Sequence, residues 1–207
     1  MTHRIDLDAL DPRERYKLLC AAVIPRPVAW VTTVDTAGVV NAAPFSFFNV
    51  FGQDPALIVL GLEHRAGGVP KDTTRNIRRS GEFVVNIATP DLLEPMLGTA
   101  AEHAGSETEA LGLATEPSVA VAPPRLADAP VSIECRQLTT LAFSNERDLV
   151  IGRAVAMAAR DGLIDAATWR FDWGGEYPVA RLFADRYASL EELAPMTIPT
   201  APQGGQP

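Results

Sequence analysis

Short apolar runs separated by turn-forming residues dominate the first half of the chain. Residues 28–34 and 39–45 are two such runs, and residues 35–38 (DTAG) between them end in a glycine that can adopt a positive φ angle. This pattern predicts a β-hairpin. Residues 56–62 are apolar throughout, which predicts a strand that is buried on both faces or lies inside a barrel.

Helices are predicted where capping residues flank a short segment. Asp11 and Pro12 are suited to the N-cap and the first helical position of one helix. Asp72 is the expected N-cap of another, and Gly81 is suited to the position that follows its last residue. The predicted helical segments are 11–19, 73–80 and 90–101.

The second half of the chain completes the pattern of a mainly β protein. Residues 131–143 and 149–159 are two long β-type runs that we expect to pair. Strands at short spacing, with helices interspersed, favour a closed antiparallel β-barrel with helical insertions over a series of βαβ units. Shorter strands are predicted at 82–88 and 179–183, and a helical or turn segment at 161–169.

The length and composition predict one domain. The chain has 207 residues, of which 47% are hydrophobic, and this is typical of a globular protein with a sizeable core. We expect residues 1–194 to form this domain. Residues 195–207 contain Pro, Gln and Gly with almost nothing to bury, so we expect a mobile C-terminal tail.

The charge and the reactive residues argue against several classes of function. A formal net charge of −8 disfavours nucleic-acid binding and docking on an anionic membrane. The 2 cysteines and 3 histidines are scattered, without the spacing of a metal site. No apolar run approaches the ~18 residues of a membrane span, and no signal peptide precedes the first predicted helix, so we expect a soluble, cytoplasmic protein.

Residues 71–76 (KDTTRN) have the composition of an anion-binding helix start. Lys71, the hydroxyl of Thr73 and free backbone N–H groups converge there, and a lysine at this position opposes the helix dipole unless an anion is present. The preceding glycines superficially resemble the glycine-rich loop of nucleotide hydrolases. Pro70 precedes Lys71 and Asp72 follows it, however, which breaks that pattern. The segment therefore predicts a phosphate site of another kind.

The second strand of the predicted hairpin has an unusual composition. Residues 41–49 read NAAPFSFFN, although proline cannot donate to a β-ladder and alanine fills little of a core. Such a segment suits a sheet edge at which a flat ligand lies against the backbone, and a purely structural bulge is the alternative. A planar ring here and a phosphate at Lys71 together suggest flavin mononucleotide (FMN).

Three ordered motifs resemble the flavin reductase-like family: residues 26–33 (RPVAWVTT), 41–49 (NAAPFSFFN) and 71–77 (KDTTRNI). Residues 151–155 (IGRAV) are similar to the family's late strand, and residues 177–187 contain its closing segment. The resemblance implies an FMN-binding split β-barrel and a homodimer with each flavin near the subunit boundary. The family includes flavoredoxin and the reductase components of two-component monooxygenases.

The same resemblance implies the contacts of the cofactor. The side chains expected around the ribityl chain and the phosphate are Thr32, Thr33, Ser46, Lys71 and Thr73. Arg65 is expected to lie near the phosphate or the pyrimidine edge of the flavin. The ring would be framed by the backbone of Asn41, Ala42 and Ala43 together with Phe47 and Phe48.

The resemblance is less specific for the reaction than for the cofactor. Hydride transfer from a nicotinamide to flavin N5 requires no protein acid or base, so no catalytic residue is assigned. The leading hypothesis is an NAD(P)H:flavin oxidoreductase that uses NADH or NADPH to reduce FMN for a partner monooxygenase or another electron-acceptor protein. The alternatives are an FMN-binding electron carrier without direct nicotinamide use, and a binding module without a redox role. Segment 100–124 departs from the family pattern and could cover the open face of the flavin, where a nicotinamide would approach.

Overall fold

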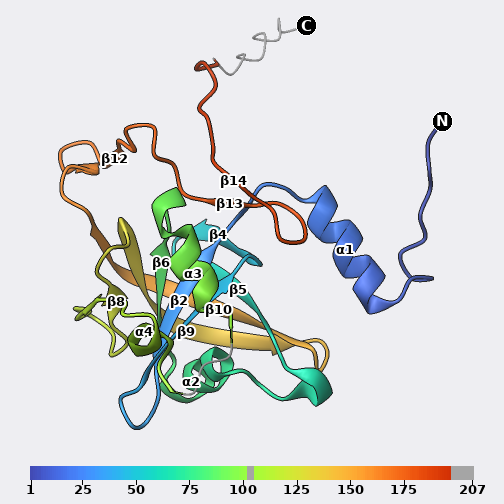
Figure 1. The fold of residues 1–207 in the computed structure, drawn as a ribbon, viewed down its shortest axis with the longest axis horizontal. Helices are drawn as coiled ribbons and strands as arrows, with labels where there is room; N and C mark the ends of the chain where they lie inside the picture. Colours follow the sequence, from blue (N-terminus) through green and yellow to red (C-terminus); the bar gives the residue numbers. More distant parts are fainter. Residues whose placement is uncertain (102–104, 197–207) are drawn as a thin grey trace, which may run out of the picture.

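The computed structural model describes residues 1–101 and 105–196 of the chain. Its body is a seven-stranded antiparallel sheet with the strand order β3-β2-β6-β9-β10-β5-β4 (Figure 1). The predicted C-terminal tail lies outside the described residues from position 197 onward. The strands of this sheet are β2 (Ala29–Val34), β3 (Val40–Phe45), β4 (Phe48–Gln53), β5 (Ala56–Glu63), β6 (Glu82–Ile87), β9 (Val131–Ala142) and β10 (Arg147–Ala159).

The sheet closes on itself because its two edge strands are neighbours in the chain. β3 and β4 lie at opposite ends of the strand order, yet Ser46 and Phe47 alone separate them in sequence. The sheet must therefore curl until its edges meet. At this junction the N–H of Gly61 in β5 donates to the carbonyl of Phe47 at 2.7 Å. The predicted β-barrel with helical insertions is confirmed.

Strand β2 is buried on both faces. Ala29 and Val31 belong to the core inside the barrel, which also contains Phe83. Trp30, between them in sequence, belongs to a second core outside the barrel that includes Met96. Because successive residues of a strand point to opposite faces, a strand between two cores carries apolar side chains at consecutive positions.

Short helices decorate the barrel, and their ends follow the capping signals. The carboxylate of Asp11 accepts hydrogen bonds from the N–H groups of Arg13 and Glu14 and forms a capping box with Glu14. Gly81 ends the second helix with a left-handed φ of 69°. The helices are α1 (Pro12–Ala22), α2 (Asp72–Ser80), α3 (Leu93–Gly98) and α4 (Glu107–Ala110), with 3₁₀ turns at η1 (Ala66–Gly68) and η2 (Pro90–Leu92).

The start of α2 differs from the prediction. Lys71 rather than Asp72 is its N-cap residue, and no side chain caps the helix. Asp72 is the first helical residue, and its carboxylate pairs with Arg65 at 3.3 Å and with Arg75. The prediction of Asp72 as N-cap was therefore wrong by one residue, because its carboxylate is drawn to two arginines.

A small second sheet joins the segment before β2 to the C-terminal segment of the domain. β1 (Arg26–Pro27) pairs with β13 (Ala180–Arg181), which confirms the strand predicted at 179–183, and β13 pairs with β14 (Tyr187–Ala188). Figure 1 shows this segment crossing the barrel toward α1. No helix in the described part of the chain has the length and apolar character of a membrane span.

Most local predictions are confirmed. The hairpin β2–β3 and the pair β9–β10 are present as expected. Of the two alternatives for segment 161–169, helix or turn, the structure shows turns, together with the short strand β11 (Ile164–Asp165), which pairs with β12 (Arg170–Phe171). β7 (Thr115–Glu116) and β8 (Arg125–Leu126) form another small sheet that the sequence pattern did not indicate.

Candidate functional site

Two adjoining hollows lie where β3 meets the start of α2. We call the larger one, of about 240 Å³, the aromatic pocket, because Tyr16, Phe45, Phe47 and Tyr187 line it. The smaller one, of about 160 Å³, is called the threonine pocket after Thr73 and Thr99 in its lining. The two hollows share the lining residues Pro44, Phe45, Lys71 and Ala100, so they adjoin each other.

The threonine pocket gathers the donors that the sequence predicts for a phosphate. Arg65, Lys71 and Thr73 all line it, and α2 begins there without a side-chain cap. The hydroxyl oxygen of Thr73 accepts from Nδ2 of Asn41 at 2.8 Å, which leaves the hydroxyl proton for another acceptor. A cation, a hydroxyl donor and a helix N-terminus therefore converge on one hollow.

Lys71 has a carboxylate partner that the sequence did not reveal. Its Nζ lies 3.6 Å from Oε2 of Glu63, and the two side chains are 43% and 58% exposed. Glu63 thus supplies part of the negative charge expected near Lys71. Because an ion pair this exposed is weak, a phosphate can compete for the lysine.

Thr32 and Thr33 are placed differently from the other predicted contacts. Both are fully buried, and neither lines the two hollows. The hydroxyl of Thr32 donates to the carbonyl of Pro124 at 2.6 Å, and that of Thr33 accepts from Nδ2 of Asn76 at 3.0 Å. These hydroxyls tie β2 to the segment before β8 and to α2, so the structure gives them a bracing role beside the predicted one.

The edge of β3 is partly covered by the segment that departs from the family pattern. The N–H of Ala42 donates to Oε2 of Glu107 in α4 at 3.2 Å, and the hydroxyl of Ser106 donates to the carbonyl of Val40 at 2.7 Å. Asn41 and Ala43 still line the threonine pocket. Since β3 is an edge strand, the missing N–H of its proline costs no ladder bond.

The three residues that follow β3 line two neighbouring hollows. Ser46 and Phe47 line the aromatic pocket, where the guanidinium carbon of Arg147 lies 4.4 Å from the ring centroid of Phe47. Phe48 begins β4 and instead lines a neighbouring apolar groove with Ser46 and Phe47. Of the eleven predicted contacts, the aromatic pocket therefore receives Ser46, Phe47 and Lys71, and the threonine pocket receives Asn41, Ala43, Arg65, Lys71 and Thr73.

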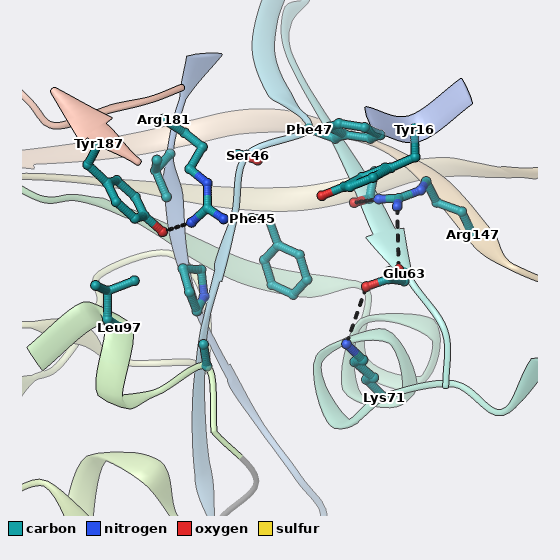
Figure 2. Close-up of a pocket in the computed structure, with 14 residues that line it drawn as sticks. Tyr16, Phe45, Ser46, Phe47, Glu63, Lys71, Leu97, Arg147, Arg181 and Tyr187 are labelled. Atoms are coloured by element: carbon teal, nitrogen blue, oxygen red, sulfur yellow. Dashed lines mark hydrogen bonds and ion pairs between the residues drawn. The ribbon is translucent and has the colours of Figure 1, made fainter. Parts of the chain in front are cut away.

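Several lining residues were not predicted, because distant segments deliver them. Figure 2 shows Arg181 and Tyr187 on one side of the aromatic pocket, Phe45 in the middle, and Lys71, Glu63 and Arg147 on the other side. The closing motif at 177–187 marked Arg181 and Tyr187 as part of the family pattern, but nothing in the sequence placed them beside Lys71. The residues added by the structure include Tyr16, Glu63, Leu97, Arg147, Arg181 and Tyr187.

Arg26 holds the two chain ends that supply this wall. Its guanidinium donates from Nη1 to the carbonyl of Val23 at 3.0 Å, after the end of α1, and from Nη2 to that of Leu182 at 2.6 Å, after β13. Arg26 is itself buried. The first motif residue thus acts as a brace that brings α1, with Tyr16, and β13, with Arg181, against the barrel.

The aromatic pocket is electropositive within an acidic protein. Lys71, Arg147 and Arg181 line it, against the single carboxylate of Glu63. Burial lowers the pKa of Arg181, and burial followed by the nearby Cys20 raises the pKa of Tyr16, so the phenol stays neutral at physiological pH. Cationic and hydroxyl donors at one end of a hollow and aromatic side chains at the other fit a phosphorylated planar ring such as FMN.

Comparison with known proteins gives one consistent picture. The family model described as "Flavin reductase like domain" matches residues 21–178. The uncharacterized protein YwrF of Bacillus subtilis is 38% identical over 192 residues, which cover 89% of this chain and 93% of YwrF. The uncharacterized protein BH2278 of Halalkalibacterium halodurans is 36% identical, with 97% and 98% covered.

Solved structures with the same fold include proteins of named activity. The 2-nitrobenzoate 2-nitroreductase NbaA of Pseudomonas fluorescens has a TM-score of 0.88 at 35% identity and covers 98% of this chain and 100% of its own. Nitrilotriacetate monooxygenase component B of Bacillus cereus has a TM-score of 0.87 at 33% identity, with 95% and 100% covered. The flavoredoxin of Desulfovibrio vulgaris, with 84% and 91% covered, is similar in fold alone, at 19% identity and a TM-score of 0.71.

Proposed function

The chain belongs to the flavin reductase-like family, and from this membership and the joined hollows we propose that it binds FMN and reduces it with NADH or NADPH. The observation that carries the proposal is that the two hollows adjoin at Lys71. One hollow offers phosphate donors and the other offers aromatic walls. A flavin mononucleotide contains both a phosphate and a planar ring, and its ribityl chain joins them.

The proposed contacts divide by chemistry. Lys71, Thr73 and Arg65 would hold the phosphate, with the uncapped start of α2. Ser46 and the two buried threonines, Thr32 and Thr33, remain the proposed neighbours of the ribityl chain. The proposed frame of the ring consists of the backbone of Asn41, Ala42 and Ala43 with the side chains of Phe47 and Phe48.

The protein's part in the reaction is to bind, orient and exclude water. FMN, when bound, supplies the hydride-accepting chemistry, and this requires no protein acid or base. The cations of the aromatic pocket attract anionic ligands to the site. Tyr16, which is neutral, packs at a tilt on Phe47 with 5.9 Å between ring centroids and forms one wall of the pocket.

We further propose a partner protein and a cytoplasmic location. Component B of nitrilotriacetate monooxygenase is by its name part of a monooxygenase system, and it is 33% identical to this chain. This supports a role in delivering electrons to a monooxygenase or another acceptor. A flavoredoxin-like carrier that takes electrons from a protein without using nicotinamide is the second candidate, because α4 covers part of the β3 edge.

A homodimer is proposed from an exposed apolar surface. A groove of about 470 Å³ runs beside the barrel and is lined by Leu19, Val23, Phe48, Phe51 and Leu149, among others. Phe51 is 66% exposed, which is unusual for a phenylalanine in a strand. Light scattering after gel filtration measures the mass, and Phe51→Glu is expected to shift a dimer to a monomer.

One experiment tests the proposed function directly. Purified protein is titrated with FMN, freed of excess by gel filtration, and its visible spectrum is recorded before and after NADH or NADPH. We expect a yellow protein that NADH or NADPH bleaches and air reoxidises. A protein that stays colourless after FMN addition contradicts the proposal, and one that binds FMN but oxidises neither nicotinamide supports the electron carrier.

A further inference from the structure

One end of the aromatic pocket carries a cation that has no ion-pair partner in the described part of the chain. Lys71 and Arg147 both pair with Glu63, at 3.6 and 3.9 Å. Arg181 lies on the other side of the pocket (Figure 2), and within the described ranges no carboxylate comes within ion-pair distance of its guanidinium. The charge of Asp185 acts on the guanidinium without forming an ion pair with it. In a chain with a net charge of −8, an arginine that lines a hollow without an ion-pair partner favours binding of an anion there.

Arg181 is held in position by its own strand pair. Its Nη1 donates to the hydroxyl of Tyr187, and its Nη2 donates to the carbonyl of Ala184. The guanidinium carbon also lies 4.5 Å from the centroid of the Tyr187 ring. A guanidinium has five N–H groups, so these contacts fix its plane and leave donors for a ligand.

Tyr187 adds a second donor at the same place. Its oxygen already accepts from Arg181, so its own proton needs another acceptor, and no residue in the described part of the chain is seen to provide one. A guanidinium N–H beside a phenol O–H matches the two oxygens of a carboxylate. The side chains next to this pair, Val28, Phe45 and Leu97, are apolar and suit a flat ring that carries the carboxylate directly.

We propose that Arg181 and Tyr187 bind the carboxylate of a planar organic acid that is the electron acceptor of this protein. The inference rests on the proposed function, because the acceptor needs a reduced flavin beside it. In the overall reaction NAD(P)H and one proton are consumed, the acceptor gains two electrons and two protons, and NAD(P)⁺ is released. The carboxylate is unchanged and serves as the handle.

The test uses benzoate as a redox-inert probe and benzamide as its neutral counterpart. Both are titrated calorimetrically into FMN-free and FMN-loaded protein, and FMN affinity is measured for every variant. We expect benzoate to bind at least about tenfold more tightly than benzamide, Arg181→Gln to weaken benzoate about tenfold, and Tyr187→Phe about threefold. Arg186→Gln is the matched control, since Arg186 stacks on Phe183 and does not line the pocket, and it should leave benzoate affinity unchanged.

The outcomes separate this inference from the proposed function. Equal binding of benzoate and benzamide, or wild-type benzoate affinity in a folded Arg181→Gln protein, overturns the carboxylate site. A parallel loss of FMN and benzoate affinity in Arg181→Gln also overturns it, because Arg181 would then serve the cofactor. Protein that binds benzoate through Arg181 but never binds FMN disproves the proposed function, and the acceptor assignment fails with it.

Discussion

Arg78 donates two hydrogen bonds to the fully buried carboxylate of Asp148, at 2.8 Å from Nε and 2.9 Å from Nη2. The pair fastens α2 to β10. Nε2 of His64 lies 3.4 Å from the same carboxylate. α2 begins beside Lys71 and carries Thr73. The contact between Arg78 and Asp148 therefore helps to fix the position of the proposed phosphate donors relative to the barrel.

Removal of Arg78 should therefore destabilise the fold. Arg78→Ala leaves the buried charge of Asp148 without its bidentate partner, and we expect a loss of about 2 kcal/mol in the free energy of unfolding, moderated because the arginine is partly exposed. Urea denaturation measures the change. Arg79→Ala, on the exposed face of the same helix, is the control and should stay within about 0.5 kcal/mol of wild type. Equal stability of the two variants would contradict the prediction.

Lys71→Ala should weaken FMN binding by about 1.5–3 kcal/mol, the scale of a hydrogen bond to a charged group. The weakening should diminish at high salt, because Lys71 is partly exposed and its charge is screened. Fluorescence titration of FMN at two salt concentrations measures it. Lys17→Ala, an exposed lysine on α1, is the matched control. Unchanged affinity of Lys71→Ala at low salt would show that the phosphate lies elsewhere.

Gly152→Ala should destabilise the barrel through its core. A Cβ atom at this position would lie 2.6 Å from Cζ and 2.9 Å from Cε1 of Phe83. Phe83 is fully buried, so its ring cannot move aside without disturbing its neighbours, and we expect a loss of about 1–3 kcal/mol. Thermal or urea unfolding measures it.

A second substitution identifies the cause. Phe83→Leu shortens the side chain that would clash, so the double variant should be more stable than the sum of the two single effects predicts. Strict additivity would mean that Phe83 is not what excludes a larger residue at position 152.

The stability of the fold should fall at alkaline pH through Cys135. Burial, followed by the charge of Glu134, raises the pKa of the Cys135 thiol from 9.0 to about 12. Above pH 9 the unfolded chain loses this proton and the folded chain keeps it. The contribution is therefore fully present below pH 9 and is lost as the pH rises toward 12, by about 1.4 kcal/mol per pH unit.

Comparison with Cys135→Ala isolates this effect. The free energy of unfolding is measured by urea denaturation between pH 8 and about 10.5. The wild-type curve should fall more steeply than that of the variant above pH 9. Parallel curves would show that the Cys135 thiol is not the cause of the loss of stability at alkaline pH.

Much of the barrel was predictable because its signals are local. The glycine at the end of the 35–38 turn, the capping residues Asp11 and Gly81, and the apolar run at 56–62 each act on a few neighbouring residues. The start of α2 was misjudged by one residue because Asp72 is drawn to Arg65 and Arg75, and a pairing with Arg65 depends on how the preceding loop folds.

The candidate site was predictable only in part, because the direction of its side chains depends on contacts between distant segments. Lys71, Thr73, Asn41 and Ala43 were named from motifs, and the structure brings all four to one hollow. Thr32 and Thr33 belong to the same motif set, yet their hydroxyls bind Pro124 and Asn76 inside the fold. A motif records which residues occur together, and it does not record which way each side chain points once two cores lie on either side of a strand.

The sequence by itself determined the family, the mainly β barrel and the residues at the start of α2, because periodicity, capping and motif spacing are properties of neighbouring residues. Only the tertiary structure decided that Glu63 forms an ion pair with Lys71, for which a phosphate would compete. It also decided that Arg26 holds α1 and β13 together. As a result, Tyr16, Arg181 and Tyr187 complete the aromatic pocket. Those residues come from segments far apart in the chain: Tyr16 lies in α1, whereas Arg181 and Tyr187 lie in the small sheet that β13 and β14 form with β1. Contacts between distant segments are not encoded in the pattern of neighbouring residues, so the sequence alone could not reveal them.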